Sequence, residues 1–406
     1  MDKYKEVFLK AVSFAVKGEQ MTDDPCLSEA EWIALLNLAA EQEILPLTFE
    51  AVMSCRSFSS VNGEIRRKFK DAAVTLSIRQ VMQTNEFLTL LMHLRQKGME
   101  PAVLKGIVVR RLYPKPVLRP SVDEDILIDP KDAGKIHKLL IEEGLTPDSE
   151  YESFENAGDL SYHRIGTPTY IEVHTSMFPK GSEAYSDLNA LFDKAEDRLV
   201  EIEEEDVSFK TLSAEDHLLY LLLHAYKHFL HSGMGLRHVC DICIFAEKMN
   251  VDGRRIREIC DEMGLSHLFA AVFEIGRRYL GLNGYPAFDD IEADPEPLLA
   301  DMLSGGLYGV EDVNRAHSST LTLEAVASHK KGRRSRGALH SVFLPKGDLE
   351  GRYPYLKKHG WLLPVAWAQR GISYLRSRKN NPVSPSESLR IGRERVELLR
   401  KYGIID

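Results

Sequence analysis

The sequence lacks long apolar runs. Apolar stretches such as Leu218 to Leu223 are interrupted within a few residues, whereas a helix that spans a bilayer requires about 20 residues. The first residues, Met1 to Glu6, are mostly charged, and no long apolar region with a small-residue cleavage site accompanies them. We therefore expect no membrane span, no secretory leader and a cytoplasmic location.

Cysteine is scarce, with five residues in a chain of 406. An odd number at irregular spacing is not typical of a disulfide framework. Cys240 and Cys243 have the spacing of half a zinc site, but no second pair completes it. We expect all five to be reduced thiols with packing or surface roles, because unpaired cysteine is often buried.

An excess of positive charge is also missing. The formal net charge is -9, so contact with a polyanion requires a local basic patch, and general DNA binding is not expected. The hydrophobic share of 44% and the charged share of 28% are close to globular averages, which favours a folded chain. At this length we expect two or three packed units.

Helical periodicity dominates the first hundred residues. Apolar residues recur at steps of three and four through Phe8 and Val12, again through Trp32 and Leu35, and again up to Leu94. The last of these segments ends in a basic turn followed by Gly98, a usual stop signal. Residues 1–98 are therefore predicted to form an N-terminal helical region.

Short β-favouring runs follow, and we expect an α/β core over residues 99–210. The expected strands cover residues 102–104, 122–128, 160–165 and 169–174, with a helix over 131–143. A capping-box pattern from Ser213 to Asp216 then predicts a helical domain over 211–330. Residues 331–406 read as a basic and helical tail, with a basic run at 330–336 in a loop and a final helix near 387–402. The fold class is α+β, mainly α, with a small mixed sheet flanked by helical regions.

Two acids separated by one residue form the strongest motif. Asp123 and Asp125 lie on one face of the expected strand, because side chains alternate along a strand. Carboxylates held this close repel each other unless a cation lies between them, and hard oxygen ligands suit Mg²⁺. Two such ions can activate a hydroxyl and neutralise a leaving pyrophosphate. The motif predicts a magnesium site for phosphoryl chemistry.

Features on either side of this strand strengthen the interpretation. Upstream, Lys105 and Gly106 follow a short strand, and a glycine there lets the backbone approach a phosphate closely. Downstream, Glu172 is a single carboxylate within an apolar strand, where burial without a partner is costly.

These residues together resemble the uncharacterised nucleotidyltransferase family of the DNA polymerase beta-like superfamily. The resemblance extends over roughly residues 80 to 250 and follows the superfamily's order of a glycine motif, an acid pair and a later acid. The segments that carry it are Leu104 to Gly106, Tyr113-Pro114 with Pro116, Arg119-Pro120, Asp123 to Ile128 and Ile171 to His174.

The resemblance implies a role for each of these residues. The ligands of two Mg²⁺ ions would be Asp123, Asp125 and Glu172. Glu172 would also help to activate the acceptor hydroxyl. Gly106 would approach the triphosphate, with Lys105 and Arg119 as its charge partners, since a guanidinium fork matches phosphate oxygens. The alternative for Lys105 and Arg119 is that they are surface cations.

The sequence departs from the superfamily pattern at two positions. Ile107 follows Gly106 where serine or a second glycine is usual, so one hydroxyl contact to phosphate is missing. Glu124 stands between the two aspartates where an apolar residue is usual, and alternation places it on the opposite face. Either that face is exposed locally or Glu124 has a partner, and we favour exposure.

A second cluster of polar residues is rich in histidine. Its members are His217, His224, His228, His231 and His238. His224 and His228 share a helical face, but Ala225 stands where a metalloprotease needs glutamate. His224 and His228 with Asp241 would suit a metal-dependent phosphohydrolase. The family resemblance extends through this helix and implies instead that His224, Lys227 and His228 contact nucleotide or acceptor. A purely structural role is the third possibility.

The resemblance therefore favours a magnesium-dependent nucleotidyltransferase. It would move a nucleoside monophosphate from a nucleoside triphosphate to an acceptor hydroxyl and release pyrophosphate. The acceptor, a small molecule, a protein or an RNA end, stays open. The alternatives are a noncatalytic nucleotide-binding or scaffold protein with this fold, and the histidine-based phosphohydrolase.

Overall fold

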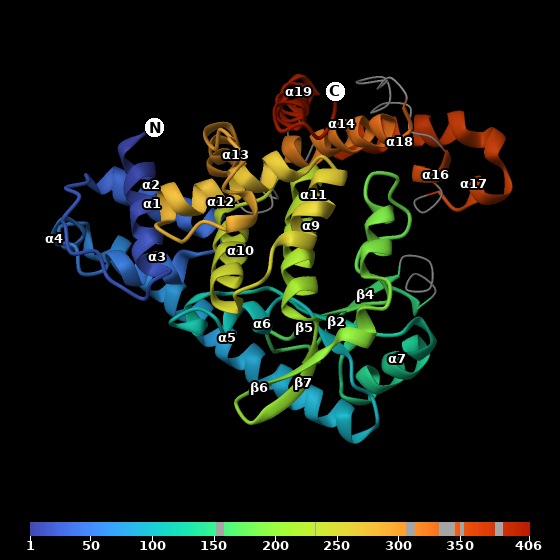
Figure 1. The fold of residues 1–406 in the computed structure, drawn as a ribbon, viewed down its shortest axis with the longest axis horizontal. Coiled ribbons are helices and arrows are strands. Elements are labelled where there is room, and N and C mark those ends of the chain that lie inside the picture. The colour runs from blue at the N-terminus through green and yellow to red at the C-terminus, as the bar shows by residue number, and fades with distance from the viewer. Residues whose placement is uncertain (152–157, 232, 306–312, 333–345, 350–352, 378–384) are drawn as a thin grey trace.

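A computed structural model describes residues 1–151, 158–231, 233–305, 313–332, 346–349, 353–377 and 385–406. These residues form a mainly helical α+β fold around one seven-stranded mixed sheet, as the sequence predicted (Figure 1). Within the described ranges, no helix has the length and apolarity needed to cross a membrane. All five cysteines are free thiols, and four of them are buried.

The N-terminal region is helical, which confirms the periodicity of its apolar residues. Its helices are α1 (Lys3–Ala15), α2 (Glu29–Glu41), α3 (Leu45–Val52), α4 (Arg56–Ser59) and α5 (Gly63–Gln96). Helix α2 begins with a capping box between Ser28 and Glu31. Helix α5 runs along one side of the sheet (Figure 1) and ends just before Gly98, whose φ of +67° is the left-handed conformation that glycine adopts readily.

The sheet has the strand order β3-β4-β5-β2-β1-β7-β6. Its strands are β1 (Ala102–Val103), β2 (Glu124–Leu127), β3 (Thr146–Pro147), β4 (Asp159–His163), β5 (Tyr170–His174), β6 (Val200–Glu204) and β7 (Val207–Thr211). Four of these match expected strands, whereas β3, β6 and β7 were not predicted. Strands β2 and β5 pair in parallel at the centre, and β1 runs antiparallel to β2.

Two short helices connect strands of the sheet. They are α6 (Ile107–Arg110), directly after β1, and α7 (Ala133–Glu142), between β2 and β3. Helix α7 lies within the range predicted for it. Both helices bury apolar side chains, so they cover the strands between which they stand.

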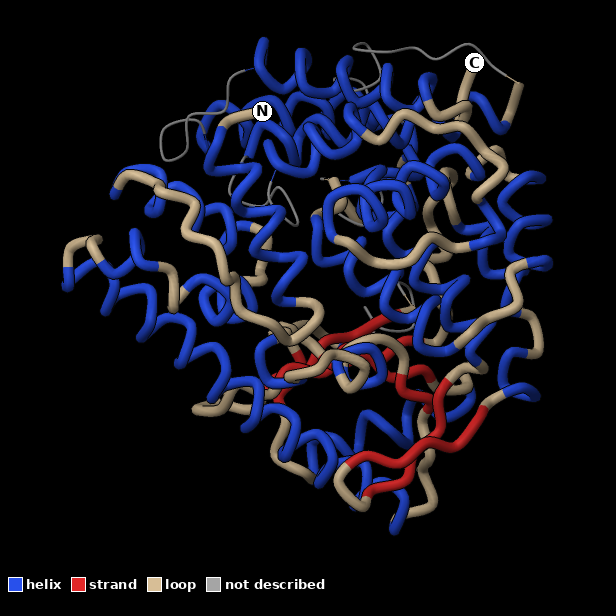
Figure 2. The backbone as a smooth tube through the Cα atoms, turned by 60° about the vertical axis from the view of Figure 1, so that its left-hand side comes forward, coloured by secondary structure: helices blue, strands red, loops and turns tan. Residues whose placement is uncertain are grey.

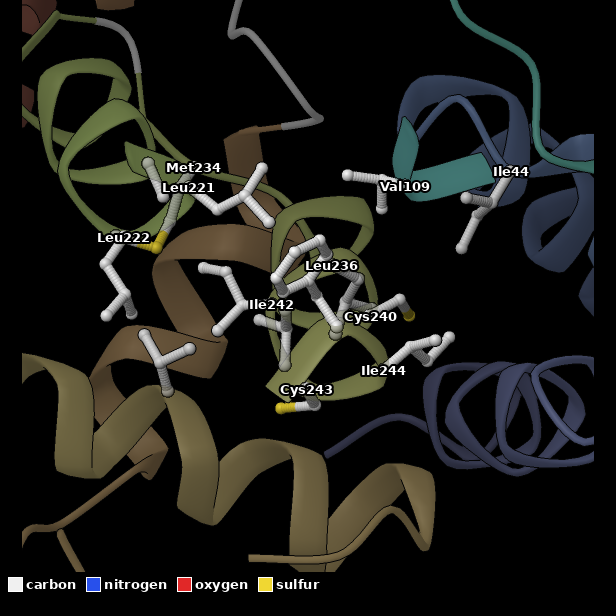
Figure 3. Packing of buried hydrophobic residues seen from close by; sticks show 14 of the residues in the cluster. Ile44, Val109, Leu221, Leu222, Met234, Leu236, Cys240, Ile242, Cys243 and Ile244 are labelled. Carbon is white, nitrogen blue, oxygen red and sulfur yellow. The ribbon is translucent and has the colours of Figure 1, made fainter. Parts of the chain in front are cut away.

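A helical unit follows the sheet, as the capping box at Ser213 predicted. It contains α9 (Ala214–His231), α10 (Leu236–Met249), α11 (Arg254–Glu262), α12 (Ser266–Leu280) and α13 (Glu296–Gly305). Helices α9 and α10 stand over the side of the sheet opposite α5 (Figure 1). The second view shows the strands grouped together, with most of the helices above them (Figure 2). Figure 3 shows Cys240, Ile242 and Cys243 among the apolar residues that pack around α10.

Helices α10 and α12 approach each other closely at Gly276. A Cβ atom at this position would lie 2.5 Å from the sulfur of Cys243, closer than real side chains pack. The glycine is therefore needed for contact between the helices, and the Cys240-Cys243 pair has a packing role.

The last described segments are helical. They are α14 (Val313–Lys330), α16 (Lys346–Leu349), α17 (Tyr355–Lys358), α18 (Leu363–Ser377) and α19 (Pro385–Lys401). Helix α19 confirms the predicted final helix, and the guanidinium of its buried Arg395 donates to backbone carbonyls at the end of α9. Residues 333–336 of the predicted basic loop lie outside the described residues. The domain boundaries near residues 99, 211 and 331 stay predictions.

Candidate active site

The acidic residues are brought together by two central strands. In the parallel pair β2 and β5, Asp125 is in register with Glu172, so both side chains project from the same face of the sheet. Asp123 lies two residues before Asp125 and shares that face, as does His174, two residues after Glu172. The three predicted acids thus converge, joined by a histidine that the sequence interpretation did not assign to the site.

Two cations lie among these carboxylates. The Lys105 Nζ is 3.1 Å from the Asp125 Oδ1 and 3.8 Å from Asp123. The His174 Nε2 is 3.0 Å from the same Oδ1 of Asp125 and 3.5 Å from the Glu172 Oε2. The mutual repulsion of the carboxylates is thereby offset by protein cations.

The protonation of His174 reflects these partners. Burial lowers the pKa of its imidazole, but hydrogen bonds to Asp125 and Glu172 and their negative charges outweigh burial and raise the pKa to about 9. The hydrogen bond from His174 in turn lowers the pKa of Glu172, against the opposing effect of burial. At neutral pH the imidazolium and the Glu172 carboxylate therefore form a charged pair.

One oxygen of Asp125 indicates that the site can accept a further cation. The Asp125 side chain is 1% exposed, and both contacts described above go to its Oδ1. Its Oδ2 is buried and has no hydrogen-bond partner among the residues that the structure describes, although a buried ionised oxygen is costly to leave unmatched. Ligand atoms of Asp125, Glu172 and His174 lie within 4.8 Å of one another. These oxygen donors fit a hard divalent cation such as Mg²⁺.

The opposite face of β2 corrects the expectation for Glu124. Its side chain is fully buried, not exposed, and it accepts hydrogen bonds from the Arg110 guanidinium at 2.8 Å and from the Ile107 backbone N–H at 2.9 Å. Arg110, at the end of α6, is the partner that sequence spacing did not reveal. The charge of Glu124 is thus compensated inside the protein.

Only glycine fits at position 106, because of its backbone conformation and because of the close approach of Glu124. Its φ is +54°, and a Cβ atom there would lie 2.1 Å from the Glu124 Oε2. A side chain at this position would therefore displace the buried Glu124. Gly106 also lines the pocket described below, and its proximity to phosphate stays a prediction.

Arg119 is buried and engaged with Asp241, which is 122 residues further along the chain. Its Nε donates to the Asp241 Oδ1 at 3.1 Å and its Nη2 donates to Oδ2, while the Tyr113 hydroxyl donates to the same Oδ1 at 2.8 Å. Burial raises the pKa of Asp241, but Arg119 and its other partners lower it overall. Arg119 is therefore no surface cation, and the Asp241 oxygens are occupied within the protein.

A polar pocket opens beside the acids. Its polar and charged lining is Lys105, Arg119, Ser121, Asp123, His224, Arg237, His238 and Asp241, with Gly106, Leu221 and Ile242 completing the wall. The strand ends supply one side and helices α9 and α10 the other. A pocket of this composition, with one lysine and two arginines next to carboxylates, suits an anionic ligand that brings a divalent cation.

The other residues predicted to bind nucleotide stand on α9. His224 and His228 lie one turn apart with their Nε2 atoms 2.8 Å from each other. Burial lowers the pKa of both well below the usual value, and neighbouring cations lower it further. Burial also lowers the pKa of Lys227, with Lys105 adding to the effect, whereas the charges of Glu172 and Asp125 raise it. Lys227 therefore belongs electrostatically to the acidic site.

Three residues of the site were not assigned to it by sequence reasoning. His174 follows Glu172 by two residues, so strand alternation could have identified it. Arg237 and His238 begin α10, and only the packing of α10 against α9 and the end of β1 brings them to the pocket.

Comparison with known proteins identifies a family for the chain. No curated protein and no solved structure matches the chain. A family model described as an uncharacterised nucleotidyltransferase matches residues 28–281, more than half of the chain, including both central strands and helices α9 and α10. The chain therefore belongs to this uncharacterised nucleotidyltransferase family.

Proposed function

We propose that this protein is a magnesium-dependent nucleotidyltransferase that transfers a nucleoside monophosphate from a nucleoside triphosphate to an acceptor hydroxyl. Family membership supports nucleotidyl transfer in general. The observation that carries the finer proposal is the buried Asp125 Oδ2, which has no hydrogen-bond partner within the described residues and lies on the same strand register as Glu172.

The acids would hold two divalent cations at the mouth of the pocket. The ligands would be Asp123, Asp125 and Glu172. When bound, the cations supply charge neutralisation for the triphosphate and the leaving pyrophosphate. These carboxylates stand on or next to adjacent strands, and each strand is held in place by its ladder of hydrogen bonds. The oxygen ligands would therefore bind the cations without rearrangement of the protein.

The basic residues of the pocket would position the triphosphate. Lys105 contacts the acids and lines the pocket, and Arg119 and Arg237 line it as well. Arg119 is held in a fixed orientation by Asp241, so its contribution would be a fixed positive field and not a mobile contact. Lys227 and His224 would close the site from α9.

Glu172 and His174 would handle the proton of the acceptor hydroxyl. The pKa of Glu172 is lowered, so its carboxylate is ionised at neutral pH and can accept that proton. His174 donates from Nε2 to both carboxylates and thereby sets the orientation of Glu172. We assign His174 a positioning role and Glu172 the contact with the acceptor.

Calorimetry with each nucleoside triphosphate tests the proposal. We expect binding that requires Mg²⁺, and we expect it to be lost when Asp123 and Asp125 are both replaced by Asn. A matched control is Asp148→Asn, an exposed acid that pairs with His163 on the edge of the sheet. Equal binding with and without Mg²⁺, or unchanged binding by the double variant, would contradict the proposed site. If the protein is instead the histidine-based phosphohydrolase, activity should be lost in His228→Ala and retained in the double Asp123→Asn, Asp125→Asn variant.

A further inference from the structure

Three histidines meet where α9 and α10 come together. His224 and His228 occupy successive turns of α9, and His238 stands in the first turn of α10. Their ring centres lie 4.5 Å apart for His224 and His228, and 5.1 Å apart for His228 and His238. One ligand nitrogen from each lies within 4.8 Å of the other two. The structure thus replaces Asp241, which the sequence suggested as third ligand, by His238.

We propose that His224, His228 and His238 form a second metal site, which binds a divalent transition metal of the zinc class with a water molecule in the fourth position. This inference goes beyond the proposed transferase function and does not depend on it. His224 and His238 also line the polar pocket, so the open fourth position would face the space where we place the triphosphate.

The donor set differs in kind from that of the carboxylates. Imidazole nitrogens suit zinc, copper, nickel and cobalt, whereas Mg²⁺ prefers oxygen ligands and retains several waters. Three histidines with one open position is a common arrangement for zinc that is accessible to ligands. The two sites of this pocket would therefore select different metals from the same solution.

The protonation state of the cluster also suits a metal. A metal replaces the proton of an imidazole nitrogen, so binding is weakened wherever the ring is charged. Burial, followed by the charge of Arg237, lowers the pKa of His238 to about 3, and burial likewise keeps His224 and His228 neutral. The three rings are thus available as ligands at neutral pH without loss of a proton.

Two features of the surroundings oppose metal binding. Their unfavourable free energy is smaller than the favourable free energy of the bonds from the three imidazoles to the metal. Lys105 and Lys227 carry positive charge nearby, but Asp241 contributes negative charge at His238. The backbone N–H of Gly235 donates to the His238 Nδ1 at 3.2 Å, so ligation requires this ring to give up or exchange one long hydrogen bond. Bonds from three imidazole nitrogens to zinc exceed that loss.

The native chain provides the first test. The protein is stripped with a chelator, incubated with Zn²⁺ or Co²⁺, freed of unbound metal, and analysed by mass spectrometry. We expect a stoichiometric amount of bound metal, and for Co²⁺ the intense visible absorption of a tetrahedral nitrogen-rich site. Absence of both retained metal and tetrahedral absorption would overturn the inference. Since no nucleotide is present, this result is independent of the transferase proposal.

Variants locate the metal. His228→Ala and His238→Ala should each weaken zinc binding by more than the roughly 10- to 100-fold typical for loss of a residue outside the ligand set. His231→Ala is the matched control, because His231 is on the same helix but bonds to Tyr185. Asp125→Asn should retain the zinc. Full zinc content in His238→Ala, or its loss in Asp125→Asn, would place the metal elsewhere. His238→Asn, a smaller change, replaces the alanine variant if that one does not fold.

Discussion

His174 lies largely buried among the acids and His238 lines the adjoining pocket, yet their charge states are opposite. His174 has two carboxylate partners, and its pKa is raised to about 9. Burial, followed by the charge of Arg237, lowers the pKa of His238 to about 3. Burial lowers the pKa of both rings, so the opposite shift of His174 is decided by the carboxylates that the fold places next to it. The strand side of the pocket thus favours a charged imidazole, and the helix side favours neutral ones.

The largest expected effect comes from the strand side. Asp125→Asn preserves shape but removes the charge that would hold the divalent cation, so we expect nucleotidyl transfer to fall by about 1,000-fold or more, in line with the loss of a preorganised electrostatic contact. Release of pyrophosphate from each nucleoside triphosphate, with a panel of hydroxyl acceptors, measures it. Circular dichroism checks that the variant is folded. Turnover within about tenfold of the native rate would exclude Asp125 as a metal ligand.

A second prediction compares the two faces of β2. On the back face, the buried pair of Arg110 and Glu124 has side chains only 3% and 0% exposed. Arg110→Met leaves Glu124 buried without its cation and should lower the free energy of unfolding by about 3–5 kcal/mol. Chemical denaturation measures this. The double variant with Glu124→Leu should recover much of the loss, and equal stability of the single and double variants would show that the pair carries no such coupling.

The sequence predicted more of the strand face than of the helix face for a physical reason. Asp123 and Asp125 are two residues apart, which is the period of a strand, and Glu172 stands on a second strand. Local alternation is therefore enough to predict which face of its strand each acid occupies. The contact between Arg119 and Asp241 and the approach of His238 to His228 arise from packing of distant segments. No local spacing encodes such contacts, and the partner of Glu124 was missed for the same reason.

Strand β6 was missed because its sequence is unfavourable for a strand in isolation, whereas the alternation of Val207, Phe209 and Thr211 in β7 is a strand signal that the sequence interpretation overlooked. Val200 to Glu204 carries three glutamates and is mostly exposed, which reads as a loop. Its pairing with β7 at the sheet edge depends on β7 docking beside β1. Tertiary pairing thus overrides local preference there.

A third prediction concerns the pH dependence of His174 in metal-free protein. A histidine whose pKa is raised in the folded state stabilises the fold. This stabilisation is complete below the unfolded pKa of about 6.5, and it is lost as the pH rises through the folded pKa of about 9. At about 1.4 kcal/mol per pKa unit, the loss between these limits is at most roughly 3.5 kcal/mol. His174→Gln should flatten this part of the curve of unfolding free energy against pH. An unchanged slope in that variant would mean that another group titrates there.

The smallest effect should come from an exposed pair with the same chemistry. His163 Nδ1 lies 2.6 Å from the Asp148 carboxylate, a shorter contact than that of His174 with Asp125, but its side chain is 40% exposed against 14% for His174. Water screens the exposed pair and competes for its hydrogen bond, so His163→Gln should change the free energy of unfolding by less than about 1 kcal/mol. Denaturation of both glutamine variants at pH 7 makes the comparison direct. A cost at His163 equal to that at His174 would show that contact distance, and not burial among carboxylates, determines what such a pair contributes.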